Sequence, residues 1–185
     1  MKNTKDFFLK SPGYFVKRLT RKDTHLLQGL YDRCAEFFIL TDGLAPSPTA
    51  ADEEFDDVPE GKTAEDVYIF GLFDSRNNLL GEISAVRHYP DVQTWWIGLM
   101  MLDPEYRGQG LGADFFRGFE HWVSAQGISQ ISLVAIEANE TGLQFWKRMG
   151  FEAIRKTPPR QYKAKTHAVY VLSRAIIMPE SSVNS

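Results

Sequence analysis

The chain has 185 residues, of which 43% are hydrophobic and 13% aromatic, and its formal net charge is −3. This length suffices for one well-cored domain and is too short for two large ones. The hydrophobic content excludes a disordered chain, and the slightly acidic balance argues against nucleic acid as the main partner. No apolar run approaches the roughly 18 residues of a membrane-spanning helix, so we expect no membrane partner.

The first residues and the cysteine count bear on the compartment. The start MKNTKDFFLKSPGYF has no long apolar stretch and no small-residue cleavage site, so we expect no signal peptide. Cys34 is the only cysteine, which excludes an internal disulfide and a cysteine-rich zinc site. We therefore expect a cytoplasmic protein without a metal, and we interpret Cys34, in a helical pattern with Leu30 and Phe38, as a core residue rather than a nucleophile.

The first third of the chain predicts a strand, a helix and an acidic loop. Residues 14–20 (YFVKRLT) favour a short strand, and the T-x-x-D sequence that follows has the spacing of a capping box. Apolar residues at helical spacing then predict a helix over residues 21–38. Proline, glycine and acidic residues dominate residues 41–66, which predict a loop with a short helix near residues 50–57.

A meander of three strands follows. The predicted strands are residues 67–74, 79–89 and 94–102, all rich in β-branched and aromatic residues. The sequence SRNN between the first two is a hairpin signal. The last, TWWIGLMML, is apolar nearly throughout, as in a strand covered on both faces.

The pattern then changes to helical spacing. Leu111, Phe115 and Phe119 lie on one helical face, and Gly127 has the position of a C-terminal cap. The remaining predicted elements are a buried strand (128–138), a short helix from Asn139 to Gly150, and two closing strands around the loop 157–165.

This order contains one βαβ crossover, so the last strand of the meander and the next strand should be parallel. We therefore predict an α/β fold with a mixed sheet and helices on both of its faces. Residues 1–178 should form a single domain, followed by a polar tail over residues 179–185.

The sequence PEYRGQGLGADFF places three glycines where a helix is about to begin. The first N–H groups of a helix lack internal partners and carry the positive end of its dipole, so they attract anions. Gly108, Gly110 and Gly112 would allow close approach of a ligand, and Arg107 could fork onto phosphate. The turn thus predicts a site for a pyrophosphate or diphosphate ester. A glycine-rich turn beside an exposed arginine is the alternative.

A dinucleotide-binding enzyme is a competing interpretation of the same turn. Gly108, Gly110 and Ala113 satisfy the pattern G-x-G-x-x-G/A, and Glu137 ends the next strand about where the ribose-binding acid belongs. That fold needs two βαβαβ halves, whereas only one βαβ unit is visible here. The Rossmann interpretation therefore fails on architecture.

Two motifs resemble the GNAT superfamily of N-acetyltransferases. Arg107-x-x-Gly110-x-Gly112 resembles the family's R/Q-x-x-G-x-G/A motif, and LMMLDPEYRGQGLG resembles its fourth strand, turn and third helix. NETGLQFWKRMGF resembles its second signature, an asparagine followed by a helix that ends in Gly-Phe. The resemblance covers residues 67–150 well and the first sixty residues in outline. It implies a fold in which the parallel fourth and fifth strands splay apart.

The resemblance implies that acetyl-CoA binds as a co-substrate in the cleft between the splayed strands, with no metal. The residues that would hold its pyrophosphate are Arg107, Gly108, Gln109, Gly110, Leu111 and Gly112. The pantetheine arm would bond to the backbone of Met100, Met101 and Leu102, where one N–H could polarise the thioester carbonyl. Asn139 would meet the pantetheine from the other parallel strand, and it also has the position of a plain helix N-cap.

The catalytic positions of the family match less well. Many members place on the last helix a tyrosine that protonates the leaving thiolate, and Trp146 occupies that position here. Its indole is no useful acid, so the chain has no general acid at this position of the family. An alkyl thiol with a pKa near ~8.5 is a fair leaving group unaided. We expect Trp146 in the core or as a wall of the cofactor cleft.

A base must remove a proton from the acceptor ammonium, whose pKa is near ~10.4. Family members carry a glutamate on the fourth or the fifth strand, where this chain has Trp96 or Val134. The remaining candidates are Glu82 and His88, at even spacing on the third strand and so on one face, and Glu137. We favour Glu82; a surface charge is its alternative.

The resemblance implies transfer of the acetyl group to a primary amine of a small acceptor, by direct attack in a ternary complex. Aromatic residues near the meander and an acidic loop favour a cationic acceptor. The acids are Asp42, Asp52, Glu53, Glu54, Asp56, Asp57 and Glu60. A solvated acidic loop is the alternative for this feature, and a non-catalytic acyl-CoA-binding or regulatory module is the alternative for the whole protein. A homodimer is common in the family.

Overall fold

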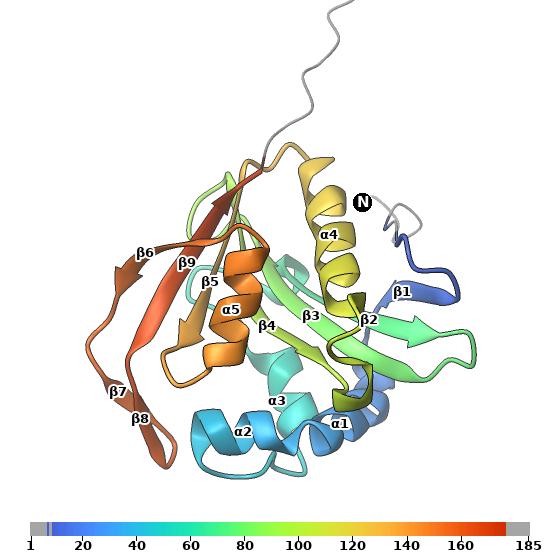
Figure 1. Cartoon of the computed structure of the whole chain (residues 1–185), viewed down its shortest axis with the longest axis horizontal. Coiled ribbons are helices and arrows are strands. Elements are labelled where there is room, and N and C mark those ends of the chain that lie inside the picture. Colours follow the sequence, from blue (N-terminus) through green and yellow to red (C-terminus); the bar gives the residue numbers. More distant parts are fainter. Residues whose placement is uncertain (1–6, 8, 177–185) are drawn as a thin grey trace, which may run out of the picture.

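The computed structural model describes residues 7 and 9–176, so the predicted polar tail lies outside the described residues (Figure 1). The helices are α1 (Thr24–Arg33), α2 (Ala35–Asp42), α3 (Ala50–Asp56), α4 (Leu111–Ser124) and α5 (Glu140–Arg148). The strands are β1 (Tyr14–Arg18), β2 (Val67–Asp74), β3 (Leu79–Arg87), β4 (Thr94–Leu102), β5 (Gln130–Ile136), β6 (Glu152–Lys156), β7 (Arg160–Tyr162), β8 (Lys165–His167) and β9 (Val169–Ala175).

Seven strands form one mixed sheet in the order β1-β2-β3-β4-β5-β9-β6. Every neighbouring pair is antiparallel except β4 and β5, which are parallel and joined through α4. The predicted mixed sheet and its single βαβ crossover are therefore confirmed. Strands β7 and β8 pair only with each other. Strand β7 lies within the predicted loop 157–165, whereas most of β8 lies in the strand predicted to follow it.

Helices cover both faces of the sheet, and each face has its own apolar cluster. Helices α4 and α5 lie against one face (Figure 1), where Phe115, Phe119 and Trp122 pack on Phe70 and Trp95. Helices α1, α2 and α3 pack on the other face around buried side chains such as Leu27, Leu30 and Tyr31. Most of the buried aromatic side chains belong to the first cluster. Aromatic rings bury much apolar area per residue, so they contribute a large part of the apolar area buried on this face.

The helix predicted over residues 21–38 is divided in the structure. A short 3-10 turn at Arg21–Asp23 carries the predicted capping box between Thr20 and Asp23. Helix α1 then ends at Cys34, whose φ of −102° and ψ of 24° interrupt the helix before α2 begins. The continuous apolar spacing did not indicate this break, because Leu30 before it and Phe38 after it pack with Cys34 in the same apolar cluster.

The other boundaries agree or differ by a few residues. Strands β2 and β4 have the predicted bounds, and α3 falls within the predicted short helix. Strand β3 ends two residues early, because His88 has a φ of 53° and lies in a turn.

Candidate functional site

The two parallel strands separate partway along their length. Their pairing begins at Thr94 with Gln130 and ends at Ile97 with Leu133. Both strands continue beyond that pair, β4 to Leu102 and β5 to Ile136, without pairing to each other. The fourth and fifth strands are therefore splayed, as the resemblance implied, and an edge of β4 is open beside the start of α4. We call the opening between the two strands beyond Ile97 and Leu133 the splay.

The open edge of β4 begins at Gly98. Ser84 and Ala85 on β3 pair with Leu99 and Ile97, so Gly98 is the extra residue of a β-bulge. Gly98 is exposed, and a Cβ there would lie 3.9 Å from the backbone and hydroxyl oxygens of Ser84. The first open residue of β4 thus lies directly against Ser84.

The three predicted pantetheine-binding residues lie along this open edge. Met101 is buried against the cluster under α1, whereas Met100 and Leu102 are partly buried on the side of α4 and α5. Because these side chains alternate between the two faces of the sheet, their main-chain N–H and C=O groups lie along the unpaired edge of β4 at the splay. This arrangement fits an extended ligand that bonds to main-chain groups of β4.

The turn before α4 requires two of its glycines for backbone conformation. Gly108 has a φ of 74° and Gly110, the N-cap of α4, has a φ of 85°; a Cβ at either would meet nothing within 4 Å. Both values favour glycine over residues with a Cβ. Gly112 differs, because a Cβ there would lie 3.7 Å from both Leu102 and Phe145. Its missing side chain leaves room for one carbon atom between Leu102 of β4 and Phe145 of α5.

The remaining residues of the turn take structural roles through their side chains. The Gln109 amide donates to the Glu105 carbonyl at 3.0 Å. Leu111 is buried in the core, so it can serve a ligand only through its backbone N–H. Asp114 in the first turn of α4 accepts from the N–H groups of Lys10 and Ser11, at 3.0 and 2.7 Å. That carboxylate is therefore engaged by the N-terminal segment.

Arg107 binds protein groups rather than projecting freely. Its guanidinium donates to the Leu102 carbonyl at 2.7 Å, pairs with Glu36 at 2.7 Å, and contacts the Cys34 sulfur at 3.5 Å. These contacts join the glycine turn to the end of β4 and to the junction of α1 and α2. The fork onto phosphate expected from the sequence would require Arg107 to leave partners that it has here.

Asn139 and Trp146 lie on the α5 side of the splay. The Asn139 side-chain oxygen accepts from the Gly142 N–H at 2.9 Å, so its predicted capping role is present. Trp146 is 8% exposed and packs edge-to-face on Phe116 and Phe151. Its indole belongs to the core, one of the two places expected for it.

Glu82 is fully enclosed, at 0% exposure, on the face of β3 that α1 and α3 cover. Neither carboxylate oxygen has a hydrogen bond of normal geometry, and the same holds for the Tyr31 hydroxyl beside it. Burial, with the nearby charge of Glu54 as a smaller cause, raises the pKa of Glu82 well above its usual range. The alternative of a surface charge is therefore wrong for this residue.

Glu54 of α3 is a site residue that the sequence did not single out. It interacts with Glu82 and with the hydroxyl of Ser84, and burial raises the pKa of its carboxyl. Glu54 lies three residues after the buried Ala51, which places it on the inner face of α3. That spacing was visible in the sequence, but Glu54 stood among six other acids of one loop.

The other candidate bases lie apart from this cluster. His88 is exposed in a turn, with Nδ1 2.7 Å from the Val92 carbonyl oxygen, so it does not share a strand face with Glu82. Glu137 pairs with Lys156, whose hydrogen bond lowers the pKa of the Glu137 carboxyl. Cys34 is fully buried, and burial raises the pKa of its thiol to about 11, which supports a core role.

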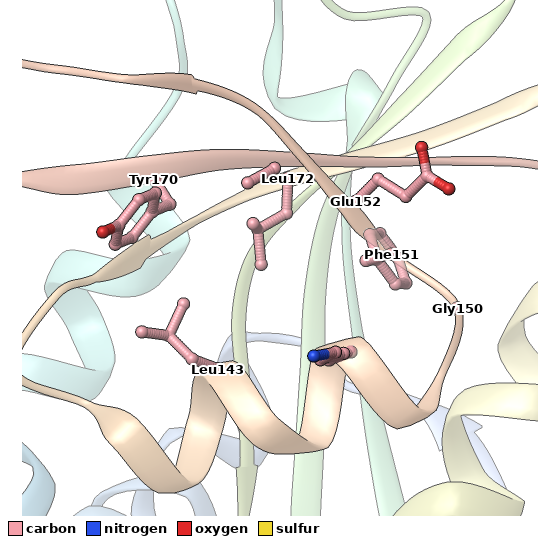
Figure 2. Close-up of a pocket in the computed structure, with 8 residues that line it drawn as sticks. Leu143, Gly150, Phe151, Glu152, Tyr170 and Leu172 are labelled. Carbon is pink, nitrogen blue, oxygen red and sulfur yellow. The ribbon is translucent and has the colours of Figure 1, made fainter.

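A separate groove lies between α5 and the end of the sheet. Figure 2 shows Leu143 of α5 facing Tyr170 and Leu172 of β9, with Phe151 at one end. The residues that line it also include Lys147, Gly150, Glu152 and Ala153. None of them belongs to β4 or to the glycine turn, so this groove is distinct from the splay.

Among residues 7 and 9–176 there is no group of three or more His, Cys, Asp or Glu side chains that could hold a metal ion. Within those residues no helix has the length and apolar character needed to cross a membrane.

A model of the Acetyltransferase (GNAT) family matches residues 26–151. The chain belongs to the GNAT acetyltransferase family. The matched range contains β2 to β5, the glycine turn and α5, which are the parts that build the splay. Among curated protein sequences, none matches the chain significantly.

Solved structures share the GNAT fold over most of the chain. An acetyltransferase from Thermus thermophilus has a TM-score of 0.72 at 18% identity, covering 88% of this chain and 96% of its own. A ribosomal-protein-S5-alanine acetyltransferase from Vibrio fischeri has a TM-score of 0.70 at 15% identity, with coverages of 91% and 96%. A spermidine N-acetyltransferase from Vibrio cholerae, solved with CoA and spermine, has a TM-score of 0.68 at 13% identity, with coverages of 90% and 97%. At these identities the likeness shows the fold alone.

Proposed function

We propose that this GNAT protein transfers the acetyl group of acetyl-CoA to a primary amine of a small acceptor. The observation that carries the proposal is the end of β4–β5 pairing at Ile97 and Leu133, beside the glycine turn that starts α4. This geometry offers unpaired main-chain groups of β4 next to the N–H groups of a 14-residue helix.

The residues present fit acetyl-CoA. The backbone of Gly108 to Gly112 would hold the diphosphate, with two positive φ angles shaping the turn and Leu111 contributing its N–H. The ligand would run from the turn toward β4 past Gly112, where no Cβ stands between Leu102 and Phe145. Acetyl-CoA supplies an activated thioester, and a main-chain N–H of Met100 to Leu102 would polarise its carbonyl.

The reaction would be direct attack in a ternary complex, which depends mainly on positioning two reactants. The acceptor ammonium must first lose a proton, and the acidic cluster around Glu82 is the group on the α1–α3 side of the splay that could receive it. The leaving thiolate would be protonated without help from position 146, because Trp146 has no suitable acid and is enclosed.

Support for a cationic acceptor is divided. Asp42 is paired with Lys163, and Asp56 is paired with Arg21, so part of the acidic loop is neutralised within the protein. Glu53 accepts from Ser47 and Thr49 in the same loop. Asp52, Glu54, Asp57 and Glu60 are in none of the ion pairs of the described residues, and of these four Glu54 lies on the inner face of α3.

Two measurements test this function. Calorimetry with acetyl-CoA and with desulfo-CoA would measure binding, and thiol release from acetyl-CoA with a panel of primary amines would measure turnover. We expect binding and amine-dependent release. Absence of binding would refute the proposal.

The second candidate is a non-catalytic acyl-CoA-binding module. The observations that favour it are the enclosed Trp146 in the tyrosine position and the enclosed Glu82. Binding of acetyl-CoA without thiol release under any amine would support this module over the enzyme.

A further inference from the structure

Three acidic side chains meet beneath α1 and α3. Tyr31 comes from α1, Glu54 from α3 and Glu82 from β3, and each affects the ionisation of another. Burial is the largest influence on all three and raises the pKa of each. Enclosed acidic side chains without a hydrogen-bond partner are rare in folded proteins, because an unsatisfied buried polar group is destabilising.

Glu82 cannot itself touch an acceptor in this arrangement. It is 0% exposed, both oxygens lack a hydrogen bond, and its strand neighbours are Gly71 and Met101. A carboxylate so enclosed is held in its neutral form unless a cation reaches it. Any proton that it exchanges must pass through a neighbouring group.

Glu54 is that neighbour. It is partly exposed, it interacts with Glu82 on one side, and the Ser84 hydroxyl interacts with it on the other. Ser84 in turn lies against Gly98, the exposed first residue of β4 beyond its last pair with β5. A continuous series of groups thus leads from the splay through Ser84 and Glu54 to the enclosed Glu82.

The charges around this series are acidic. The groups that face Glu54 and Glu82 are Tyr31 from α1, Asp57 from the loop after α3, and Ser84 from β3. None of the ion pairs among residues 7 and 9–176 includes Glu54 or Glu82. The site therefore has an uncompensated preference for a cation.

We propose that Glu54 is the carboxylate that binds the ammonium group of the acceptor and takes its proton, while Glu82 and Tyr31 behind it form an enclosed proton store. The substrate class is accordingly an aliphatic primary amine that arrives protonated. This inference rests on the proposed function and assigns its proton acceptor and its substrate class.

The step balances in atoms and charge. The Glu54 carboxylate takes one proton from R–NH₃⁺ and becomes neutral, which leaves R–NH₂ with a free electron pair. The nitrogen uses this electron pair to form a bond to the acetyl carbon, the carbon–sulfur bond breaks, and the thiolate leaves with the electron pair of the carbon–sulfur bond. The second proton of the nitrogen passes to the sulfur, giving the N-acetyl amine and the free thiol, and Glu54 returns its proton to solvent after release.

The first experiment needs no turnover. The protein carries ¹³C at the glutamate side-chain carboxyl carbons, the signals are assigned with Glu54→Gln and Glu82→Gln, and n-butylammonium chloride is added. We expect a saturable shift of the Glu54 signal, a smaller shift of Glu82, and the same response in the control Glu65→Gln, which removes an exposed acid elsewhere. A Glu54 signal that does not respond would overturn the inference, even if acetyl-CoA binds as proposed.

The second experiment compares n-butylamine, which is protonated at neutral pH, with aniline, which is not. Glu54→Gln should lower kcat/KM for n-butylamine about 100-fold and that for aniline by less than about threefold, since only the first acceptor needs a base before attack. Its affinity for acetyl-CoA should stay unchanged. Equal losses with both amines, or none with either, would contradict the role of Glu54.

The pH profile separates Glu54 from a merely structural residue. The nearby charge of Asp57 raises the pKa of Glu54, so Asp57→Asn should lower that pKa and move the acid limb of kcat/KM to lower pH. If Glu82→Gln abolishes the limb and Glu54→Gln retains it, Glu82 is the base and the assignment is wrong. If the wild type binds acetyl-CoA but releases no thiol with any amine, the proposed function fails, and the carboxyl signals still decide whether Glu54 binds an ammonium.

Discussion

The Arg107 guanidinium donates to the Leu102 carbonyl at 2.7 Å and thereby ties the glycine turn to the last residue of β4. The same guanidinium pairs with Glu36 at the start of α2. One side chain thus links the turn, the open strand and the helices on the other face of the sheet. The planar fork of arginine suits this task, because its donors point in several fixed directions at once.

Replacing Arg107 by lysine should separate charge from geometry. Lysine keeps the positive charge but cannot reach the same set of partners, so we expect Arg107→Lys to weaken CoA binding about 10-fold, or about 1.4 kcal/mol. Arg107→Ala should be only slightly worse. Calorimetry with CoA measures both variants, and Arg76→Lys on the β2–β3 hairpin is the control. Wild-type affinity in the lysine variant would mean that charge on the diphosphate is what matters.

Replacing Gly110 should weaken CoA binding in addition to straining the backbone. Gly110→Ala forces a residue with a Cβ into a φ of 85°, at a cost of about 1 kcal/mol. Gly61→Ala is a matched control, because Gly61 has a φ of 78° and equally open surroundings in a loop. Urea unfolding should show similar losses in both variants, while only Gly110→Ala should lose affinity for CoA. Similar affinities in the two would remove the turn from the cofactor site.

Strands and caps with local signals were predictable from the sequence. Strands β2 and β4 have the predicted bounds because each is a continuous apolar run bounded by turn-forming residues. The capping box of Thr20 and Asp23 needs only residues three apart, and it is present. The parallel pairing of β4 and β5 followed from the helix between them.

Features that depend on distant residues were not predictable. Arg107 meets Glu36 and Cys34 across about seventy residues of chain, so its side-chain partners had no local signal. The burial of Glu82 depends on where α1 and α3 settle, and the importance of Glu54 follows only from that placement. The break at Cys34 leaves the helical spacing intact and is visible only in the backbone angles.

Asn139 allows its two proposed roles to be measured separately. Its oxygen caps α5 through the Gly142 N–H, which leaves the amide nitrogen as a donor for the pantetheine. Asn139→Ser should keep the cap, while Asn139→Ala should lose about 1 kcal/mol of stability. Both variants should bind acetyl-CoA several-fold more weakly, by about 1 kcal/mol for one lost hydrogen bond. Undiminished affinity in the serine variant would leave Asn139 as a cap alone.

The enclosed Glu82 should make the stability of the protein depend on pH. In the unfolded chain its pKa returns to about 4.3, whereas burial holds the folded value well above that. The folded state therefore binds more protons above this pH, and its stability should fall as pH rises toward the folded pKa, by about 1.4 kcal/mol for each pH unit between the two values. Glu82→Gln has no such proton to lose, so its free energy of unfolding should change less over the same range.

Urea unfolding from pH values near 5 to values near 9 would measure this pH dependence, with the exposed Glu65→Gln as the control that keeps the wild-type slope. Parallel slopes in wild type and Glu82→Gln would show that Glu82 titrates normally and that the enclosed acid pair does not exist in solution.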